Sequence, residues 1–331
     1  MLKHRAWGGT KLQTLDKELP PDTAIGESWE LSDLPDAISE GQSVVAEGSL
    51  RGRTIHDLLQ SDPGGMLGQV PTTADGRFPL LIKYLDAAEN LSLQVHPSPE
   101  YAAEHPEAKV KSEWWFIIAA EPGACIYRGI RSEVTPSAFE QSIEKGTALE
   151  YLDRIPVHPG MCIRLPSGIC HAMGAGILAA EVQTTSDTTF RVWDWNRNDP
   201  GRPLHVEEAM ASMRFGAAQE QGGRAILDSE EIPAVQVGGV CSQRVCTAPE
   251  FTIDLQEFDP GEHPIDTDDR PVIMICLDGA GLLQSEPGQA RAHRGDVILV
   301  PANCTSAALH NPERQRVLRV DIPAQGGTLI A

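Results

Sequence analysis

The sequence predicts a mainly β protein made of two jelly-roll units with a few helical insertions. Three observations support this prediction: short apolar runs between glycines and prolines are frequent, helical periodicity is scarce, and one segment occurs twice. Six runs are typical of strands: RFPLLIKYL, NLSLQVH, WWFIIA, GMCIRLP, PVIMICL and GDVILVP. A chain of 331 residues exceeds most single cores, so two packed units, or one large β architecture with an appendage, are expected.

Helices are predicted at three places. The segments are TIHDLLQ near 54–60, a block from about 136 to 153, and HVEEAMASM at 205–213. Thr135 and Pro136 open the middle block with the residue types preferred at a helix N-cap and in the first turn. These segments are few compared with the strand candidates, so they are expected to be insertions.

A polar stretch, AAQEQGGRAILDSEE at 217–231, is the best candidate for a linker. It divides the chain into two expected domains. The longer one covers residues 1–217 and carries the helical insertions, and the shorter one covers residues 232–331.

A weak internal repeat supports these two units. VHPGMCIRLPSGICHAM at 157–173 and AHRGDVILVPANCTSAA at 292–308 align in three places: Gly160 with Gly295, Pro166 with Pro301, and His171 with Ser306. Upstream of each copy an apolar run ends in a glycine, with Gly123 and Gly279 in register. The first copy reads G, five residues, P-x-G, two residues, H, which resembles the second half of the cupin signature. Two cupin-like jelly rolls are therefore expected, the second one degenerate because it lacks the imidazole.

Composition and charge exclude several classes of protein. A formal charge of −20 disfavours nucleic acid and anionic membrane as partners. The N-terminal MLKHRAWGGTKL has no apolar run after its charges, and no segment approaches the roughly 18 uninterrupted apolar residues of a membrane span. Seven cysteines without a C-x-x-C pair indicate reduced thiols rather than a disulfide framework or a thiolate zinc site. A soluble, cytoplasmic protein is expected.

Four polar residues on adjacent predicted strands indicate a metal site. Gln94 and His96 alternate with apolar residues, so both side chains face one side of a strand. Glu113 opens the next strand, and His171 closes the P-x-G corner. A lone histidine in a strand is usually an ordinary core or surface residue, but two imidazoles, one carboxylate and one amide oxygen together suit a divalent metal, above all zinc, with an open position for water or substrate.

Several segments, taken in order and spacing, resemble type I mannose-6-phosphate isomerase (phosphomannose isomerase), especially its short bacterial form. They are FPLLIKYLDAAENLSLQVHP, KSE at 111–113, PSGICHAMGAGILAAEVQ and TTSDTTFRVWDWNR, with AWGGTKL and GESWELS near the N-terminus. The resemblance is dense from residue 6 to about 215 and thins afterwards. It implies that the unit over 1–217 is catalytic, and that the substrate is a sugar phosphate.

The resemblance also implies a role for each matching residue. It implies that one zinc ion is held by four residues, namely Gln94, His96, Glu113 and His171. Arg191 matches the catalytic arginine of the family, and Glu181, ten residues before it, matches an acidic residue of the family. The phosphate contacts of the family map onto Ser92, Lys83 and Arg197.

The chemistry of this isomerisation agrees with these residue types. A proton moves between C2 and C1 through an enediol, which requires a base, stabilisation of oxyanion charge and a proton route between O1 and O2. Zinc can act there as a Lewis acid. Arg191 can stabilise the enediolate, Lys111 can assist ring opening or proton transfer, and Glu181 can serve as base or orient Arg191. Longer relatives have a histidine where this chain has Val110 and a proline where it has Ser112, so the identity of the base stays open.

Two other functions are compatible with a metal-binding cupin. A sugar sensor without catalytic activity is disfavoured by the absence of a recognisable helix-turn-helix or basic segment. An iron dioxygenase is disfavoured by the glutamine, since that iron site uses two histidines and one carboxylate. The sequence leaves open the oligomeric state, the strictness of sugar specificity and the choice between synthesis and catabolism.

Overall fold

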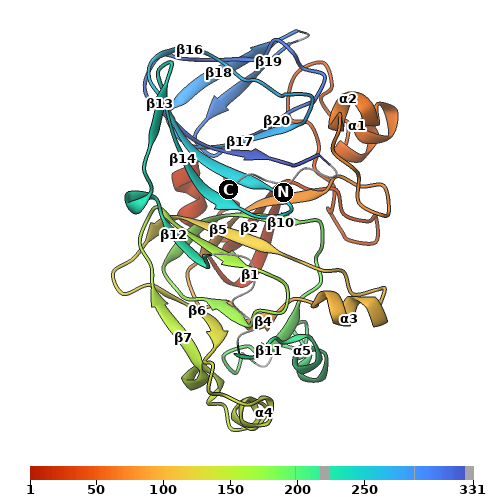
Figure 1. Ribbon diagram of the computed structural model, residues 1–331, viewed down its shortest axis with the longest axis vertical. Helices are drawn as coiled ribbons and strands as arrows, with labels where there is room; N and C mark the ends of the chain where they lie inside the picture. Colours follow the sequence, from red (N-terminus) through yellow and green to blue (C-terminus); the bar gives the residue numbers. More distant parts are fainter. Residues whose placement is uncertain (198, 217–223, 287, 325–331) are drawn as a thin grey trace.

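The computed structural model describes residues 1–197, 199–216, 224–286 and 288–324. Figure 1 shows an elongated molecule, with the strands of the N-terminal part in one half and those of the C-terminal part in the other. Each half contains two antiparallel sheets. The mainly β architecture predicted from the sequence is confirmed.

The first half contains β1 to β12. Their bounds are β1 (Leu2–Gly9), β2 (Ile25–Leu31), β3 (Leu80–Ala87), β4 (Leu93–Val95), β5 (Glu113–Ala120), β6 (Cys125–Ile130), β7 (Leu152–Pro156), β8 (Met161–Leu165), β9 (His171–Met173), β10 (Ile177–Thr184), β11 (Phe190–Trp193) and β12 (Ile226–Asp228). They form a seven-stranded sheet, β1-β2-β3-β10-β5-β8-β12, and a five-stranded sheet, β11-β4-β9-β6-β7.

The second half contains β13 to β22. Their bounds are β13 (Val235–Val237), β14 (Val240–Thr247), β15 (Thr252–Phe258), β16 (Gly261–Pro264), β17 (Val272–Asp278), β18 (Ala280–Ser285), β19 (Gly288–His293), β20 (Val297–Val300), β21 (Ala308–Asn311) and β22 (Gln315–Asp321). They form a six-stranded sheet, β13-β14-β15-β22-β17-β20, and a four-stranded sheet, β16-β21-β18-β19.

The two halves repeat one strand order. In the first, β2-β3-β10-β5-β8 faces β4-β9-β6-β7, and in the second the corresponding orders are β14-β15-β22-β17-β20 and β16-β21-β18-β19. Gly160 and Gly295, which the sequence repeat aligns, both have a positive φ, 92° and 82°, in the turns before β8 and β20. The left-handed conformation explains why both copies keep glycine there. Two jelly-roll units follow from this repetition.

The large sheet of the first half is buried on both faces. Tyr84 of β3 packs in one core with Ile253 of β15, so the outer faces of the seven-stranded and six-stranded sheets share this core. The next residue, Leu85, faces the other way and packs with Ile126 of β6 inside the first jelly roll. Lys83 lies on the same inner face as Leu85, and it therefore points into the interior of the first unit.

The three predicted helices are present. They are α1 (Ile55–Ser61), α4 (Pro136–Glu144) and α5 (Val206–Ser212). The Thr135 hydroxyl accepts a hydrogen bond from the Ala138 N–H, as expected for the N-cap of α4. The prediction of one block to about 153 is wrong, because the chain turns at Gly146 with φ 69° and continues as a short 3-10 turn and then β7.

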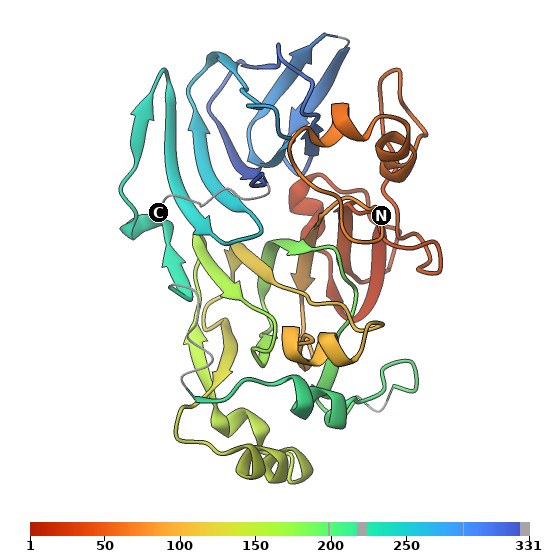
Figure 2. The ribbon, with the colours of Figure 1, turned by 45° about the vertical axis from the view of Figure 1, so that its right-hand side comes forward.

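Two single-turn helices, α2 (Pro63–Leu67) and α3 (Pro99–Glu104), were too short to be predicted from periodicity. Figure 2 shows α1 and α2 beside the second unit. Backbone N–H groups of Ala302 and Asn303 donate to the carbonyls of Met66 and Gly65, which ties this insertion to the C-terminal unit. No helix of the described residues is long and apolar enough to span a membrane.

The predicted linker at 217–231 is in part a structured segment. Residues 217–223 lie outside the described residues, but β12 pairs with β8 and extends the sheet of the first unit to Asp228. Residues 226–228 therefore belong to the sheet of the first unit. All seven cysteines are free thiols, as expected.

Candidate active site

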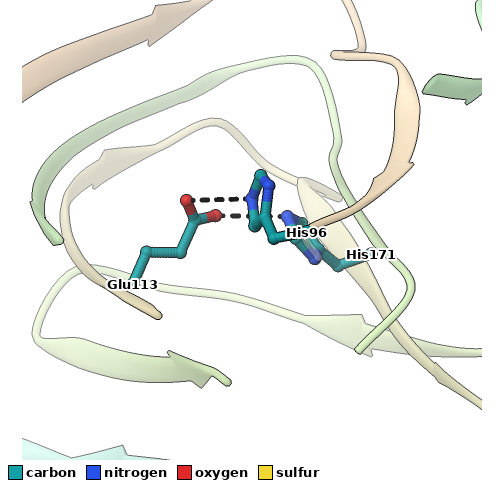
Figure 3. A group of neighbouring side chains, drawn as sticks. All are labelled: His96, Glu113 and His171. Atoms are coloured by element: carbon teal, nitrogen blue, oxygen red, sulfur yellow. Dashed lines mark ion pairs between the residues drawn. The ribbon is translucent and has the colours of Figure 1, made fainter. Parts of the chain in front are cut away.

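Three buried side chains of the first jelly roll converge at one point. Oε2 of Glu113 lies 3.2 Å from Nε2 of His96, and Oε1 of Glu113 lies 3.1 Å from Nε2 of His171. Figure 3 shows both imidazoles turned toward the carboxylate. The three side chains are at most 1% exposed. Within the described residues, this is the one group of three such ligands close enough to hold a metal ion.

Strand pairing and one tight corner bring these residues together. Gln94 of β4 is paired with His171 of β9, and Glu113 is the first residue of β5. The Gly168 N–H donates to the His96 carbonyl at 3.0 Å, which joins the P-x-G corner to the end of β4. Gly168 has φ 86°, a conformation that other residues rarely adopt. The sequence pattern P-x-G-x-x-H thus positions His171 beside the Q-x-H element.

Both imidazole rings are oriented for metal binding through Nε2. Nδ1 of His96 lies 3.1 Å from the Thr188 carbonyl, and Nδ1 of His171 lies 2.8 Å from the Ile169 carbonyl. A carbonyl accepts but cannot donate, so each Nδ1 carries the proton and each Nε2 presents its lone pair to the centre. Nε2 of His96 and Oε1 of Glu113 are buried without a hydrogen-bond partner among the described residues, and Oε2 of Glu113 has the Lys111 ammonium as its ion-pair partner. These atoms fit a divalent cation.

The charge state of the cluster is also that of a metal site. Burial, with Lys111 nearby, lowers the pKa of His96 to about 3, so this imidazole is neutral at neutral pH. Burial alone would raise the pKa of Glu113, but Lys111 and His96 lower it well below its usual range. The Lys111 ammonium lies 3.0 Å from Oε2 of Glu113. The neutral imidazole of His96 and the ionised carboxylate of Glu113 are in the forms that bind metals.

Gln94 completes the cluster as a fourth polar group. Its amide nitrogen lies 3.3 Å from Nε2 of His171, and its oxygen accepts a hydrogen bond from the Ser92 hydroxyl at 3.3 Å. A flip of the amide about the Cγ–Cδ bond exchanges its nitrogen and oxygen, and the oxygen then faces the cluster of His96, Glu113 and His171. The side chain can therefore serve as an oxygen ligand.

A cavity of about 420 Å³ lies next to this cluster. Six of the residues singled out in the sequence line it: Lys83, Ser92, Gln94, Lys111, Glu181 and Arg191. Since Gln94 and Lys111 also contact His171 and Glu113, the cavity and the metal cluster form one site. A volume of this size accommodates a small ligand.

Lys83 lies in the cavity wall between two acidic residues. Its ammonium is 3.0 Å from Oε1 of Glu181, which is directly opposite on β10, and 4.0 Å from Oε2 of Glu27 on β2. Burial alone would lower the pKa of Lys83, but Glu181 and Glu27 raise it. The lysine therefore stays charged, and its charge is balanced by protein carboxylates.

Glu181 is a buried carboxylate in the cavity wall with a raised pKa. Burial and the nearby Glu113 raise its pKa, although Lys83 acts in the opposite direction. The indole N–H of Trp115 donates to its Oε2 at 2.9 Å. A carboxylate with a raised pKa is a stronger proton acceptor than an ordinary one.

Of the two predicted arginines, Arg191 lines the cavity and Arg197 does not. Arg191 lines the cavity, and its Nη1 donates to the Pro203 carbonyl at 2.9 Å. Arg197 is not among the lining residues. Its guanidinium donates instead to the Asn90 carbonyl at 2.7 Å and forms ion pairs with Asp194 and Glu89.

Five charged residues that line the cavity were not predicted as site residues: Arg5, Glu27, Asp187, Asp199 and Arg202. Arg5 and Glu27 form an ion pair at 2.9 Å across β1 and β2. Glu27 lies in the GESWELS segment and Arg5 precedes AWGGTKL, so the sequence pointed to both regions without indicating a role for these side chains. Arg202 lies in the loop after β11, where no local pattern distinguishes it.

Comparison with known proteins identifies the family. A model of the phosphomannose isomerase type I catalytic domain matches residues 1–124. The mannose-6-phosphate isomerase of Streptococcus mutans is 37% identical over 303 residues, which cover 90% of this chain and 89% of that protein. The chain belongs to the type I phosphomannose isomerase family. The family predicted from the sequence, and with it an isomerase enzyme, is confirmed.

Other phosphomannose isomerases agree with this assignment. The probable mannose-6-phosphate isomerase GmuF of Bacillus subtilis is 40% identical over 215 residues, which span 63% of this chain and 65% of that protein. The crystal structure of the mannose 6-phosphate isomerase from Bacillus subtilis superimposes with a TM-score of 0.82 at 28% identity and covers 98% of both chains. A putative mannosephosphate isomerase from Archaeoglobus fulgidus, at 23% identity and a TM-score of 0.72, shares the fold.

Proposed function

We propose that the protein is a zinc-dependent aldose-ketose isomerase that interconverts mannose 6-phosphate and fructose 6-phosphate through an enediol. The observation that carries this proposal is the buried group of His96, Glu113 and His171 beside a cavity lined by Arg191, Lys111 and Glu181. The names of the phosphomannose isomerase relatives support the choice of substrate.

Zinc is the metal that suits this donor set. Two imidazole nitrogens and one carboxylate oxygen, with Gln94 as a fourth ligand, match a borderline divalent cation with room for substrate. When bound, the ion would polarise the oxygens on C1 and C2 of the sugar as a Lewis acid. The hydrogen bonds from the Nδ1 atoms of His96 and His171 to backbone carbonyls would hold the rings in place for it.

Glu181 is proposed as the base. Its carboxylate would take the proton from C2 and return it to C1, while the hydroxyl proton passes from O2 to O1. The raised pKa of Glu181 favours this role. Lys111 is the weaker candidate because its ammonium is engaged with Glu113 and must lose a proton before it can accept one. Lys111 can instead donate a proton during ring opening.

Arg191 is proposed to stabilise the enediolate. It is half-buried in the cavity wall, and its buried Nε has no hydrogen-bond partner among the described residues. A guanidinium with unused N–H groups can donate to oxygens that become negative during the reaction.

The proposed binding residues of the substrate are Ser92, Lys83 and Arg197, as the family resemblance implies. Ser92 and Lys83 line the cavity, which supports contact with the sugar. The ion pairs of Lys83 with Glu181 and Glu27 favour a second role, in which it holds the base in place. Arg197 would contribute from behind the cavity wall, since its guanidinium is bonded to Asp194 and to the segment at 89–90.

Two further expectations are kept as proposals. The catalytic unit is proposed over 1–217 and the degenerate cupin-like unit over 232–331, although β12 adds a strand from 226–228 to the sheet of the first unit. A cytoplasmic location is proposed, and the seven free thiols support a reducing compartment.

A coupled assay tests the proposed function. Purified protein, stripped with a chelator and reloaded with zinc or iron(II), is assayed for conversion of mannose 6-phosphate, with glucose 6-phosphate as the control substrate. We expect turnover of mannose 6-phosphate that is lost on chelation and restored by zinc. Oxygen uptake with iron and no isomerisation would instead support a dioxygenase, and sugar binding without turnover would support a sensor.

A further inference from the structure

The loop between β11 and α5 brings an arginine to the cavity. Arg202 lines it together with Arg191 and Arg5. The loop is held against Arg191, whose Nη1 donates to the carbonyl of Pro203, the residue after Arg202. Burial, followed by the charge of Arg202 and that of Arg5, lowers the pKa of Arg191. Three guanidinium groups thus line the cavity, together with the carboxylates of Asp187 and Asp199.

The Asp194 carboxylate fixes the orientation of Arg202. Nε of Arg202 donates to Oδ2 at 2.7 Å, and Nη2 donates to Oδ1 at 3.0 Å. The side chain of Arg202 is 13% exposed, and its Nη1 makes no hydrogen bond within the described part of the chain. A guanidinium held on one edge and unused on the other presents its remaining N–H groups in a fixed direction.

Arg197 binds the same Asp194 carboxylate as Arg202 does. Its Nη1 donates to Oδ1 of Asp194 at 2.9 Å, and its Nη2 donates to the Asn90 carbonyl at 2.7 Å. Trp195 anchors the same loop, with its indole N–H donating to the Leu91 carbonyl at 2.7 Å. These contacts attach the loop to the turn between β3 and β4. Two guanidinium groups share one Asp194 carboxylate, and Arg197 also pairs with Glu89, so Asp194 occupies only one edge of Arg202.

The other cations of the cavity are already balanced by carboxylates that face it. Lys83 is paired with Glu181, Lys111 with Glu113, and Arg5 with Glu27. Arg191 forms no ion pair with a carboxylate among the described residues, and Arg202 shares its partner with Arg197. Asp187 and Asp199 also line the cavity, but neither forms an ion pair with Arg191 or Arg202 within the described residues. An anionic group in the cavity can therefore bind the N–H groups of Arg191 and Arg202 that no carboxylate occupies.

We infer that Arg202 is a substrate-binding residue that receives the phosphate group of the sugar, and that Arg197 is a positioning residue that acts on it through Asp194. This inference rests on the proposed function, because the phosphate is that of its substrate. The phosphate then lies at Arg202 and not at Lys83, because the charge of Lys83 is neutralised by Glu181 and Glu27. This placement also explains how a chain with a net charge of −20 binds an anion, since the cations are supplied locally.

Four variants test this inference on the zinc-loaded enzyme: R202A, R202K, R197A and R197K. We expect R202A to raise the KM for mannose 6-phosphate and the inhibition constant of inorganic phosphate together, each by about 10- to 100-fold, as for the loss of a charge-assisted contact. R202K should recover part of both. R197A should raise both less than R202A does, and R197K should recover little, because a lysine cannot bridge Asp194 and Asn90 at once.

An exposed arginine far from the cavity provides the matched control. R154A, on β7, should leave KM, the inhibition constant of phosphate and the melting temperature unchanged. The inference is overturned if R202A changes the KM and the phosphate constant by less than twofold. It is also overturned if R197A raises both as much as R202A at an unchanged melting temperature, since Arg197 then contacts the anion itself.

Calorimetric titration with inorganic phosphate separates this inference from the proposed function. If the wild-type protein does not isomerise mannose 6-phosphate, the proposed function fails. Weaker phosphate binding by R202A than by the wild type would then still support the anion site, and equal binding would overturn it.

Discussion

Arg191 of β11 and Gln94 of β4 are paired residues of an antiparallel ladder, and Gln94 is paired in turn with His171 of β9. Side chains of directly paired residues lie on the same face of a sheet, about 5 Å apart at their Cβ atoms. Three adjacent strands therefore place a guanidinium, an amide and an imidazole in one row. Arg191, which is proposed to stabilise the enediolate, thus lies beside the proposed metal ligands. The pairing of β11, β4 and β9 in the five-stranded sheet sets the spacing between Arg191, Gln94 and His171.

Removal of either imidazole should remove the metal. We expect H96A and H171A to bind zinc at least about 100-fold more weakly and to lose activity, while the fold is kept, because each deletes one of the few ligands. Metal content after dialysis, with circular dichroism, measures this. H293A, at an exposed position on β19, is the control that should keep its metal. One tightly bound zinc per chain in both H96A and H171A would refute the ligand assignment.

The amide variant of the proposed base should separate catalysis from metal binding. In E181Q the hydrogen bond from Trp115 can persist while the proton acceptor is lost. We expect kcat to fall by about 10²- to 10⁴-fold with the zinc content unchanged. Exchange of the C2 proton of mannose 6-phosphate with deuterated water should fall equally. Exchange at the wild-type rate in E181Q would assign the base to another residue, first to Lys111.

Substitution of Lys83 should affect stability at least as much as binding. K83M leaves the carboxylate of Glu181 buried without its cation and leaves Glu27 with Arg5 alone, so we expect a loss of about 3–5 kcal/mol in the free energy of unfolding. Urea denaturation measures this loss. The double variant K83M/E27Q should lose less than the sum of the single variants, because one uncompensated charge is removed with the cation. If K83M had the stability of the wild type and only a raised KM, the result would contradict this prediction and would assign Lys83 as a phosphate ligand.

The ion pairs of Glu27 predict how stability depends on pH. Burial alone would raise the pKa of Glu27, but Lys83 and Arg5 lower it from 4.5 to about 2. Because the pKa is lower in the folded than in the unfolded state, this stabilisation is fully present above about pH 4.5 and is lost as pH falls toward 2.

Comparison of the wild type with E27Q, both free of metal, isolates this effect. The advantage of the wild type in the free energy of unfolding should shrink by up to about 3 kcal/mol between pH 5 and pH 2. Urea denaturation at several pH values in this range measures it. Groups of the empty metal site titrate in both proteins and cancel in the difference. An advantage that stays constant with pH would show that Glu27 has an ordinary pKa.

The convergence of His96, Glu113 and His171 could be predicted because the residues lie in short contiguous patterns. The alternation of Gln94 and His96 on one strand and the corner before His171 each specify local geometry, so the sequence alone indicates which side chains converge. The structure brings these two elements together through a single strand pairing, β4 with β9. The second unit lacks such a cluster in its described residues, in line with Ser306 at the position of His171.

The charged wall of the cavity could not be predicted in the same way. Arg5 and Glu27 reach it because β1, β2 and β3 are neighbours in the sheet, and Arg202 reaches it from an irregular loop. The family resemblance implied a phosphate contact for Arg197, yet its guanidinium is bonded to Asp194 and to the Asn90 carbonyl. Such long-range contacts depend on tertiary packing, which leaves no periodic signal along the chain.

The apolar layer between the seven-stranded and six-stranded sheets couples the two units thermodynamically. Since Tyr84 and Ile253 belong to one core, neither sheet can separate without exposing the partner's face to water. A ligand that binds only the native first unit therefore also raises the melting temperature of the second. Chelation of the metal should shift a single calorimetric transition of the whole chain to lower temperature, although half of the molecule never touches the ion.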